Sequence, residues 1–314
     1  MAFCSQEACA HFRDRLTPQP TANRLSLSKQ ASSQSQCGRS FTSGGRRHNA
    51  KTRFSGRGRC IPCHLACVLS LHFTAPHWPW EGPQDKAVSD SLTEVMHHDG
   101  GTIATYRAMI ESLDRNIAAV LRALQKSGKA KNTLVIFTSD NGGERFAKSW
   151  PFNGMKGELL EGGIRVPLLV RWPSQVRAGS ITQQTAMNMD FLPTLLDIAG
   201  VTPDSRRPPD GESLLPTLRD ATRVHDRTLF WRYHAHAQGA ARRGQYKYLR
   251  IENNEFLFDV VADPQERGNL NKRQEAVFLE LKDAWARWDA TLLPYTQQNA
   301  TWSNKTQNFL PDRY

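Results

Sequence analysis

The chain has 314 residues, of which 39% are hydrophobic, enough to build a sizeable core and one or two domains. Its formal net charge of +11 is uneven, because residues 1–67 contain eleven Lys/Arg against two Asp/Glu, whereas residues 68–314 are close to neutral. The positive charge therefore does not indicate a nucleic-acid-binding body, and the longest apolar run, 61–73, is too short to span a bilayer. Neither nucleic acid nor a membrane is expected as a partner.

The first segment, residues 1–67, is rich in Ser, Gln, Arg and Gly and shows no sustained periodicity, so it predicts a basic arm that is disordered or unrelated to the domain. It contains all six cysteines. The C-x-x-C-H run at 60–64 is typical of haem attachment, and Cys67 extends it towards a zinc-like spacing. We interpret this run as a coincidence, since neither a helical frame nor a second ligand pair accompanies it. Residues 1–16 lack the apolar stretch of a signal peptide, which predicts a cytoplasmic chain as written.

The segment 68–225 alternates between strand-like and helix-like patterns. A strand is predicted at 69–73, and apolar residues recur at helical spacing between 106 and 124, with a stop near Ser127 and Gly128. Two further apolar strands are predicted at 134–139 and 166–172. This alternation predicts an α/β fold.

A helix is predicted from Asp190, as its N-cap, to Ile198, with Gly200 as its stop. After about residue 226 the pattern changes to short antiparallel strands at 229–233, 246–251 and 256–258. A last helix carries its apolar residues on one face: Val277, Phe278, Leu281, Trp285 and Trp288. The sequence thus predicts a small C-terminal sheet-plus-helix subdomain over 226–295, followed by a polar tail, 296–314.

The strongest chemical signal follows the strand at 134–139. There Asp140 and Asn141 stand side by side and are followed by Gly142 and Gly143. A carboxylate beside an amide offers two hard oxygen ligands to Ca²⁺ or Mg²⁺, and glycines let the backbone turn close to an ion. An ordinary polar turn explains the same four residues, so this segment alone leaves both interpretations open.

Nine short segments, in this order along residues 69 to 292, together resemble the sulfatase family of the alkaline-phosphatase-like superfamily. They are TAPHWP (74–79), SLD (112–114), TSDNGG (138–143), MKG (155–157), EGGIRVP (161–167), MDFLPTLL (189–196), DGESL (210–214), LFD (257–259) and DPQE (263–266). The resemblance covers the C-terminal portion of such a protein. It implies an alkaline-phosphatase-like mixed or parallel sheet flanked by helices, incomplete in this chain, with the small C-terminal subdomain attached.

The resemblance also implies metal-dependent hydrolysis of a sulfate monoester on a small molecule or carbohydrate. Asp140 and Asn141 resemble metal ligands for Ca²⁺ or Mg²⁺. Lys156 resembles the lysine that holds a sulfate oxygen, and His77 resembles the histidine that contacts the sulfate and protonates the leaving group. From local sequence alone, Lys156 is equally a solvated loop lysine and His77 a capping histidine between prolines. Members of this family are often periplasmic or secreted.

Two parts of the family's chemistry are not found in the sequence. Sulfatases carry a C-x-P-S-R or S-x-P-S-R element, whose first residue becomes the formylglycine nucleophile, and an adjacent Asp-Asp pair that completes the metal shell. The run at 60–64 copies only the Cys and Pro, and no Asp-Asp pair occurs. A formylglycine residue is therefore not identifiable, and we expect weak cation binding and impaired hydrolysis. Two alternatives stay open: a phosphomonoester or phosphonate hydrolase of the same superfamily, and a non-catalytic remnant that binds sulfated ligands.

The remaining candidates are histidines and one charged pair. Glu161 and Arg165 lie in one motif and predict a structural ion pair that fixes the Gly-rich loop 153–163. His97 and His98 are interpreted as surface or loop residues. The same interpretation applies to His234 and His236, although this pair could also line the substrate cleft.

Overall fold

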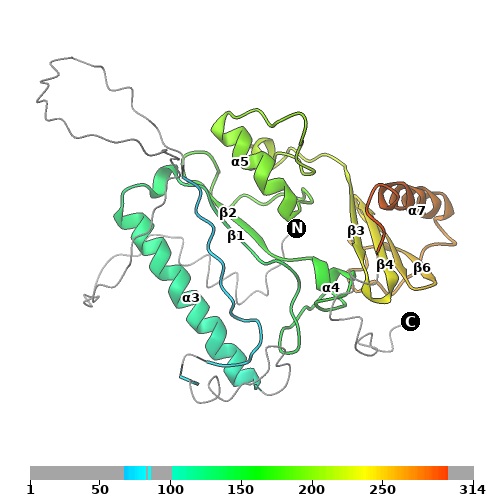
Figure 1. Cartoon of the computed structure of the whole chain (residues 1–314), viewed down its shortest axis with the longest axis horizontal. Helices are drawn as coiled ribbons and strands as arrows, with labels where there is room; N and C mark the ends of the chain where they lie inside the picture. The colour runs from blue at the N-terminus through cyan, green and yellow to red at the C-terminus, as the bar shows by residue number, and fades with distance from the viewer. Residues whose placement is uncertain (1–66, 83, 86–100, 296–314) are drawn as a thin grey trace, which may run out of the picture. The chain divides into compact units, whose positions relative to one another are not determined.

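The computed structural model describes residues 67–82, 84–85 and 101–295. Residues 72–295 belong to one compact unit, and residues 67–71 belong to another. All helices and strands of the described residues belong to the larger unit; Figure 1 shows them within the whole chain. None of the helices in the described part of the chain combines the length and apolar character that a membrane span needs.

The long helix α3 (Ile103–Lys126) confirms the helical pattern read from the sequence. The hydroxyl of Thr102 caps its first turn by accepting the Thr105 N–H at 3.1 Å, and Ser127 is its C-cap. Gly128 follows in the left-handed region with φ +71°, as a helix stop requires. The turn η1 (Ala130–Asn132) then leads into the first strand.

The strands β1 (Val135–Thr138) and β2 (Leu168–Arg171) pair antiparallel, with Val135 opposite Arg171 and Thr138 opposite Leu168. All eight strand residues are half-buried rather than fully buried. Both strands were predicted. The strand predicted at 69–73 is wrong, because residues 67–74 have no regular secondary structure. Leu69 and Phe73 are exposed, so their apolar character does not place them in a sheet.

Between β2 and the C-terminal sheet lie short helices that carry the motifs of the middle of the chain. They are η2 (Asn188–Asp190), α5 (Phe191–Ala199) and α6 (Leu215–Arg219), while α4 (Glu161–Ile164) precedes β2. Gly200 ends α5 in the left-handed region with φ +66°, as predicted.

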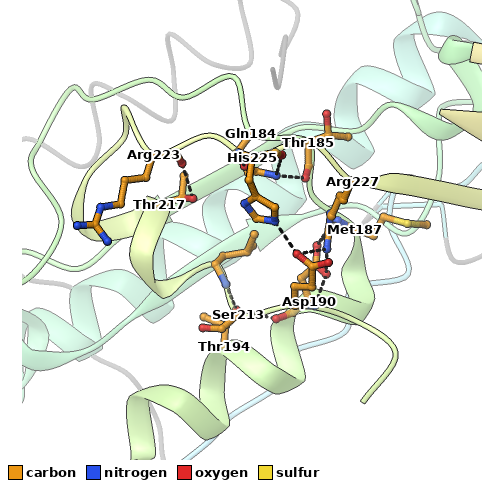
Figure 2. Close-up of polar contacts among 12 residues, drawn as sticks. Gln184, Thr185, Met187, Asp190, Thr194, Ser213, Thr217, Arg223, His225 and Arg227 are labelled. Atoms are coloured by element: carbon orange, nitrogen blue, oxygen red, sulfur yellow. Dashed lines mark hydrogen bonds and ion pairs between the residues drawn. The ribbon is translucent and has the colours of Figure 1, made fainter. Parts of the chain in front are cut away.

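The predicted capping role of Asp190 needs correction. Its carboxylate bonds no N–H of α5; it accepts the N–H groups of Met187 (2.7 Å) and Glu212 (3.0 Å) and binds both terminal nitrogens of Arg227. Figure 2 shows this arrangement, with Arg227 directed at Asp190. Asp190 is fully buried, so its charge is balanced by Arg227 rather than by a helix end.

The C-terminal part is a four-stranded antiparallel sheet in the order β3 (Thr228–Tyr233), β4 (Gln238–Arg243), β5 (Tyr246–Ile251) and β6 (Asn254–Asp259). The turn η3 (Ala235–Ala237) joins β3 to β4. The helix α7 (Glu275–Asp289) lies against the sheet (Figure 1) and buries Leu281 and Trp285 with Tyr248 and Leu257. On the other face, Leu159 and Leu160 pack with a second cluster that contains Leu249 and Phe258.

Strand β4 was not predicted, because its sequence QGAARR has neither β-branched nor aromatic residues. Its small residues are required by packing: Ala240 and Ala241 are fully buried, and a Cβ at Gly239 would overlap the ring of Trp285. The strand is thus selected by its neighbours and not by its own propensity.

Candidate active site

The loop after β1 and the Gly-rich loop that precedes α4 are joined by their backbones. The N–H of Gly142 donates to Gly163 O at 2.8 Å, and the N–H of Lys156 donates to Gly143 O at 2.9 Å. A Cβ at Gly142 would overlap the carbonyl of Gly162, so only glycine permits this approach. These bonds place Lys156 next to the turn that carries Asp140 and Asn141.

His77 and Lys156 are in direct contact although 79 positions separate them in the sequence. The Nε2 atom of His77 lies 2.6 Å from Nζ of Lys156, and its Nδ1 lies 2.7 Å from Trp78 O. A carbonyl can only accept, so Nδ1 carries the hydrogen and, in the neutral ring, Nε2 accepts from the Lys156 ammonium. The structure therefore brings together the two residues predicted to contact a sulfate group.

The ammonium of Lys156 keeps donors for a ligand. It has three N–H groups, of which one is directed at His77, and a carboxylate oxygen of Glu144 is 3.9 Å away. That separation makes an ion pair but not a hydrogen bond. With 23% of its side chain exposed, Lys156 is accessible to an anion while its backbone is fixed.

Asp140 and Asn141 occupy the turn immediately after β1, as predicted. The carboxylate of Asp140 is exposed and accepts only a long bond, 3.4 Å, from the hydroxyl of Ser139. Its oxygens are therefore chemically suited to a hard cation. Within the described residues, however, no three or more His, Cys, Asp or Glu side chains gather into a metal-binding group. The two side chains are of the chemical type that binds such a cation, but two are too few to complete its coordination shell.

Gln238, at the start of β4, holds the segment that follows Lys156. Its amide nitrogen donates to Gly157 O at 3.0 Å, and its amide oxygen accepts the Leu159 N–H at 2.9 Å. A second bond from the same nitrogen reaches Ala235 O at 3.1 Å. Gln238 is only 1% exposed. One buried amide therefore fixes residues 156–159, which we call the lysine loop, to the C-terminal sheet. Gln238 could not be predicted as a site residue, because no sequence motif marks it.

Glu161 lies at the centre of a buried ionic cluster, which we call the Glu161 cluster. Its carboxylate binds Arg165 at 3.1 Å, Arg242 at 3.0 Å and Lys247 at 3.0 Å. Lys247 also pairs with Glu266 at 2.8 Å, and Glu266 accepts the backbone N–H of Glu161 at 2.6 Å. The predicted ion pair between Glu161 and Arg165 is confirmed, as part of a five-residue cluster that joins α4 to β4 and β5.

The two carboxylates of the Glu161 cluster respond in opposite ways to burial. For Glu161, desolvation opposes ionisation, but the charges of Lys247, Arg242 and Arg165 outweigh it and lower its pKa below the ordinary value. For Glu266, burial raises the pKa, and the neighbouring Glu161 charge adds to this rise against the opposing effect of Lys247. The surrounding charges therefore favour the ionised form of Glu161, and burial disfavours the ionised form of Glu266.

The histidines singled out in the sequence separate in the structure. His236 pairs with Glu252 at 2.9 Å and has no contact with His77 or Lys156. His234 lines a small cavity of the C-terminal sheet, and His236 is not among the residues that line it. His97, His98 and the C-x-x-C-H run at 60–64 lie outside the described residues, whereas Cys67 is an exposed free thiol.

A lysine and an imidazole in contact beside an acidic turn form a site suited to a tetrahedral anion. Comparison with known families agrees: the sulfatase profile matches residues 67–201, and the profile of the N-sulphoglucosamine sulphohydrolase C-terminal region matches residues 155–288. Both profiles describe sulfatases, so residues 67–288 of the chain are similar to the sulfatase family.

Among individual relatives, human N-acetylgalactosamine-6-sulfatase is 40% identical over 148 residues, which is 45% of this chain and 28% of that protein. Mouse steryl-sulfatase is 32% identical over 221 residues, covering 57% of this chain and 35% of that protein. The crystal structure of Ps i-CgsB superposes with a TM-score of 0.60 at 26% identity, over 74% of this chain and 49% of that one. The chain thus spans less than half the length of each of these relatives.

Proposed function

We propose that the protein acts on sulfate monoesters and holds the sulfate group between Lys156 and His77. The observation that carries this proposal is the 2.6 Å contact between Lys156 Nζ and His77 Nε2, made by residues from two distant segments. Curated relatives at 40% and 32% identity bear the names N-acetylgalactosamine-6-sulfatase and steryl-sulfatase, which supports a sulfated substrate. The substrate class we propose is a small-molecule or carbohydrate sulfate ester.

The hydrogen-bond pattern supports a separate role for each side chain. The Lys156 ammonium is a compact cation with spare donors, which suits one oxygen of a sulfate group. His77 can protonate a leaving oxygen only after its Nε2 has taken up a proton from solvent, because Lys156 must keep its own three hydrogens to bind the sulfate group as an ammonium ion. The Trp78 carbonyl keeps the ring oriented through Nδ1. The pair thus binds the ester and supplies a proton at Nε2.

We propose that Asp140 and Asn141 contribute two oxygens to a Ca²⁺ or Mg²⁺ site. Such a cation would neutralise charge on the bound ester. Calcium takes six to eight oxygen ligands, so two side chains alone would hold it weakly. Because the sequence also contains neither the formylglycine element nor an Asp-Asp pair, we propose that this chain binds sulfate esters and hydrolyses them slowly.

The names of the relatives, N-acetylgalactosamine-6-sulfatase and steryl-sulfatase, favour a sulfate over a phosphate ester. The charges of Lys156 and Glu144 do not distinguish the two esters, because a doubly charged phosphate ester is attracted more by the ammonium and repelled more by the carboxylate. A phosphomonoester or phosphonate substrate and a binding-only remnant remain the alternatives that the experiment below separates.

The test is to measure binding and hydrolysis of 4-nitrophenyl sulfate and 4-nitrophenyl phosphate by the full chain and by Lys156→Ala. We expect the sulfate to bind more tightly, and Lys156→Ala to weaken it by about tenfold, because one charge-assisted contact is lost. Lys148→Ala is the matched control, since Lys148 is an exposed lysine of the same region.

Each outcome has a distinct meaning. Unchanged sulfate binding in Lys156→Ala would overturn the site assignment. Tighter binding of the phosphate would favour the phosphate alternative. Binding that depends on Lys156 without any measurable hydrolysis would favour the binding-only alternative.

A further inference from the structure

The described residues contain a small cavity at the end of the C-terminal sheet, with a volume of about 180 Å³. We call it the arginine cavity. It is lined by Arg232, Arg250, His234, Trp285, Asp289 and Tyr295, among others. Gln238 lines it as well and donates to Gly157 O, one residue beyond Lys156. The cavity is therefore linked to the proposed sulfate site through a single buried amide.

The two arginines of the cavity differ in the partners that their guanidinium groups bind. Arg232 donates to Asp289 at 3.0 Å and to Leu293 O at 2.6 Å, and it lies over the ring of Tyr295 at 4.3 Å. Its charge is thus already balanced. Arg232 therefore helps to build the wall of the cavity.

Arg250 makes no such ion pair with the described residues, although its charge acts on the carboxylate of Glu255 and helps to lower the pKa of that group. Its Nε donates to Ala237 O at 3.3 Å, and its guanidinium lies over the ring of Trp285 at 4.4 Å. The carboxylate opposite it on β6, Glu255, is bound by Lys282 at 2.6 Å and by the Tyr248 hydroxyl at 2.8 Å instead. The terminal nitrogens of Arg250 therefore present a fork that matches a carboxylate or a sulfate oxygen pair.

His234 adds an independent sign that a ligand belongs here. Its Nδ1 atom is buried and has no hydrogen-bond partner in the part of the chain that the structure describes, while its ring lies edge-on to Tyr295 at 4.5 Å. A buried polar nitrogen without a partner is costly, and a ligand oxygen in the cavity would satisfy it. The volume is below the 300 Å³ or so at which whole ligands are usually held, so the cavity suits one substituent and not a complete substrate.

We propose that the arginine cavity binds a second anionic group, a sulfate or a carboxylate, carried by a sugar adjacent to the one whose sulfate ester lies at Lys156 and His77. This inference rests on the proposed function and narrows its substrate class to an oligosaccharide with at least two negative groups. Arg250 binds the second anion through its terminal nitrogens, His234 contributes Nδ1, and the anion supplies the ion pair that Arg250 does not make with the described residues.

The experiment compares three sugars on the full chain by calorimetry. The first is a monosaccharide with one sulfate, the second extends it with a neutral sugar, and the third extends it with a sugar that carries a second sulfate or a carboxylate. We expect the third to bind about tenfold more tightly than the second. Arg250→Gln should remove this gain and leave the monosaccharide within about twofold of its original affinity.

Two further variants show whether the effect of Arg250→Gln on binding arises from a change in folding. Arg250→Lys keeps the charge but not the planar fork, so we expect it to retain part of the gain. Arg177→Gln removes an exposed arginine from the segment after β2 and should change nothing. An equal affinity for the neutral and the charged extension, or an unchanged gain in Arg250→Gln, would overturn the proposal.

If the proposed sulfate site is wrong, the affinities for the three sugars will change in a different pattern than if only the arginine cavity is wrong. If Lys156→Ala leaves the singly sulfated monosaccharide unaffected, the sulfate site is wrong whatever happens at Arg250. If Lys156→Ala weakens all three sugars and Arg250→Gln weakens none, the sulfate site stands and the arginine cavity is not a subsite.

Discussion

At the scale of single residues, the role of each atom in the site follows from whether it can donate or accept a hydrogen bond. Trp78 O cannot donate, which fixes the hydrogen on Nδ1 of His77 and makes Nε2 the atom that faces Lys156. Asp140, by contrast, is exposed and bound only weakly by Ser139, so its carboxylate remains available to a cation. The two functions that we propose for the site, anion and cation binding, are thus assigned to separate residues.

The cation assignment gives a prediction at this scale. Calcium titrated into the protein should bind weakly, with a dissociation constant on the order of millimolar, because only two side-chain oxygens are offered. Asp140→Ala should abolish the heat of binding measured by calorimetry, since it removes the single carboxylate. Asp204→Ala, at an exposed aspartate, is the control and should bind as the unchanged chain does. Persistence of calcium binding in Asp140→Ala would exclude this turn as the site.

The individual site residues show what sequence can and cannot indicate. Lys156 and His77 could be predicted because each lies in a short motif that resembles one of a known family. Gln238 could not, because its role exists only when β4 folds back beside Gly157 and Leu159. The lack of an ion pair between Arg250 and the described residues could not be predicted either, because it depends on Lys282 binding the carboxylate of Glu255.

At the scale of elements, helices were easier to predict than strands. The spacing of apolar residues and a terminal glycine located α3 and α5, and the apolar face of α7 was identified correctly. Strand β4 is made of small and charged residues, so only its burial under Trp285 reveals it. The segment 69–73 shows the reverse error, since its residues are apolar and form no strand.

The segments around α5 are joined by one buried ion pair, which supports a prediction at this scale. Asp190 is fully buried and holds Arg227, whose side chain is 9% exposed (Figure 2). Asp190→Asn should lower the free energy of unfolding by about 3–5 kcal/mol, because it leaves a buried guanidinium without its carboxylate. Urea denaturation monitored by circular dichroism would measure the loss.

A surface pair of the same chemistry provides the control for Asp190. Asp204 and Arg206 are 2.9 Å apart, but their side chains are 47% and 87% exposed. Exposed ion pairs contribute little to stability, so Asp204→Asn should leave the unfolding midpoint unchanged. Equal effects of the two substitutions would show that burial of Asp190 is not what stabilises this region.

At the scale of the whole molecule, the lysine loop and the C-terminal sheet fold as one structure because the Glu161 cluster connects them. Glu161 and Lys247 are 86 positions apart, and both side chains are almost completely buried. The general α/β class was predictable from the alternation of elements and from the family motifs. The antiparallel pairing of β1 with β2 and the five-residue ionic cluster were not, because both are set by contacts between distant segments.

The Glu161 cluster predicts how stability depends on pH. The pKa of Glu161 is lowered in the folded state, so its charge stabilises the fold above the ordinary glutamate value near 4.5, and this contribution is lost as pH falls through the folded pKa. Glu161→Gln should therefore reduce the unfolding free energy by about 3–5 kcal/mol near neutral pH and flatten the fall in stability on acidification. Thermal unfolding at a series of pH values would measure both effects.

Glu266 provides the matched variant with the opposite sign. Its pKa is raised in the folded state, so its contribution is present below the ordinary glutamate value and is lost as pH rises through the folded pKa. Glu266→Gln resembles the protonated form and can still accept the N–H of Glu161, so it should cost much less at neutral pH than Glu161→Gln. If the two variants lose the same stability at neutral pH and show the same pH profile, the two carboxylates are equivalent, and Glu161 is not the member that holds the lysine loop to the sheet.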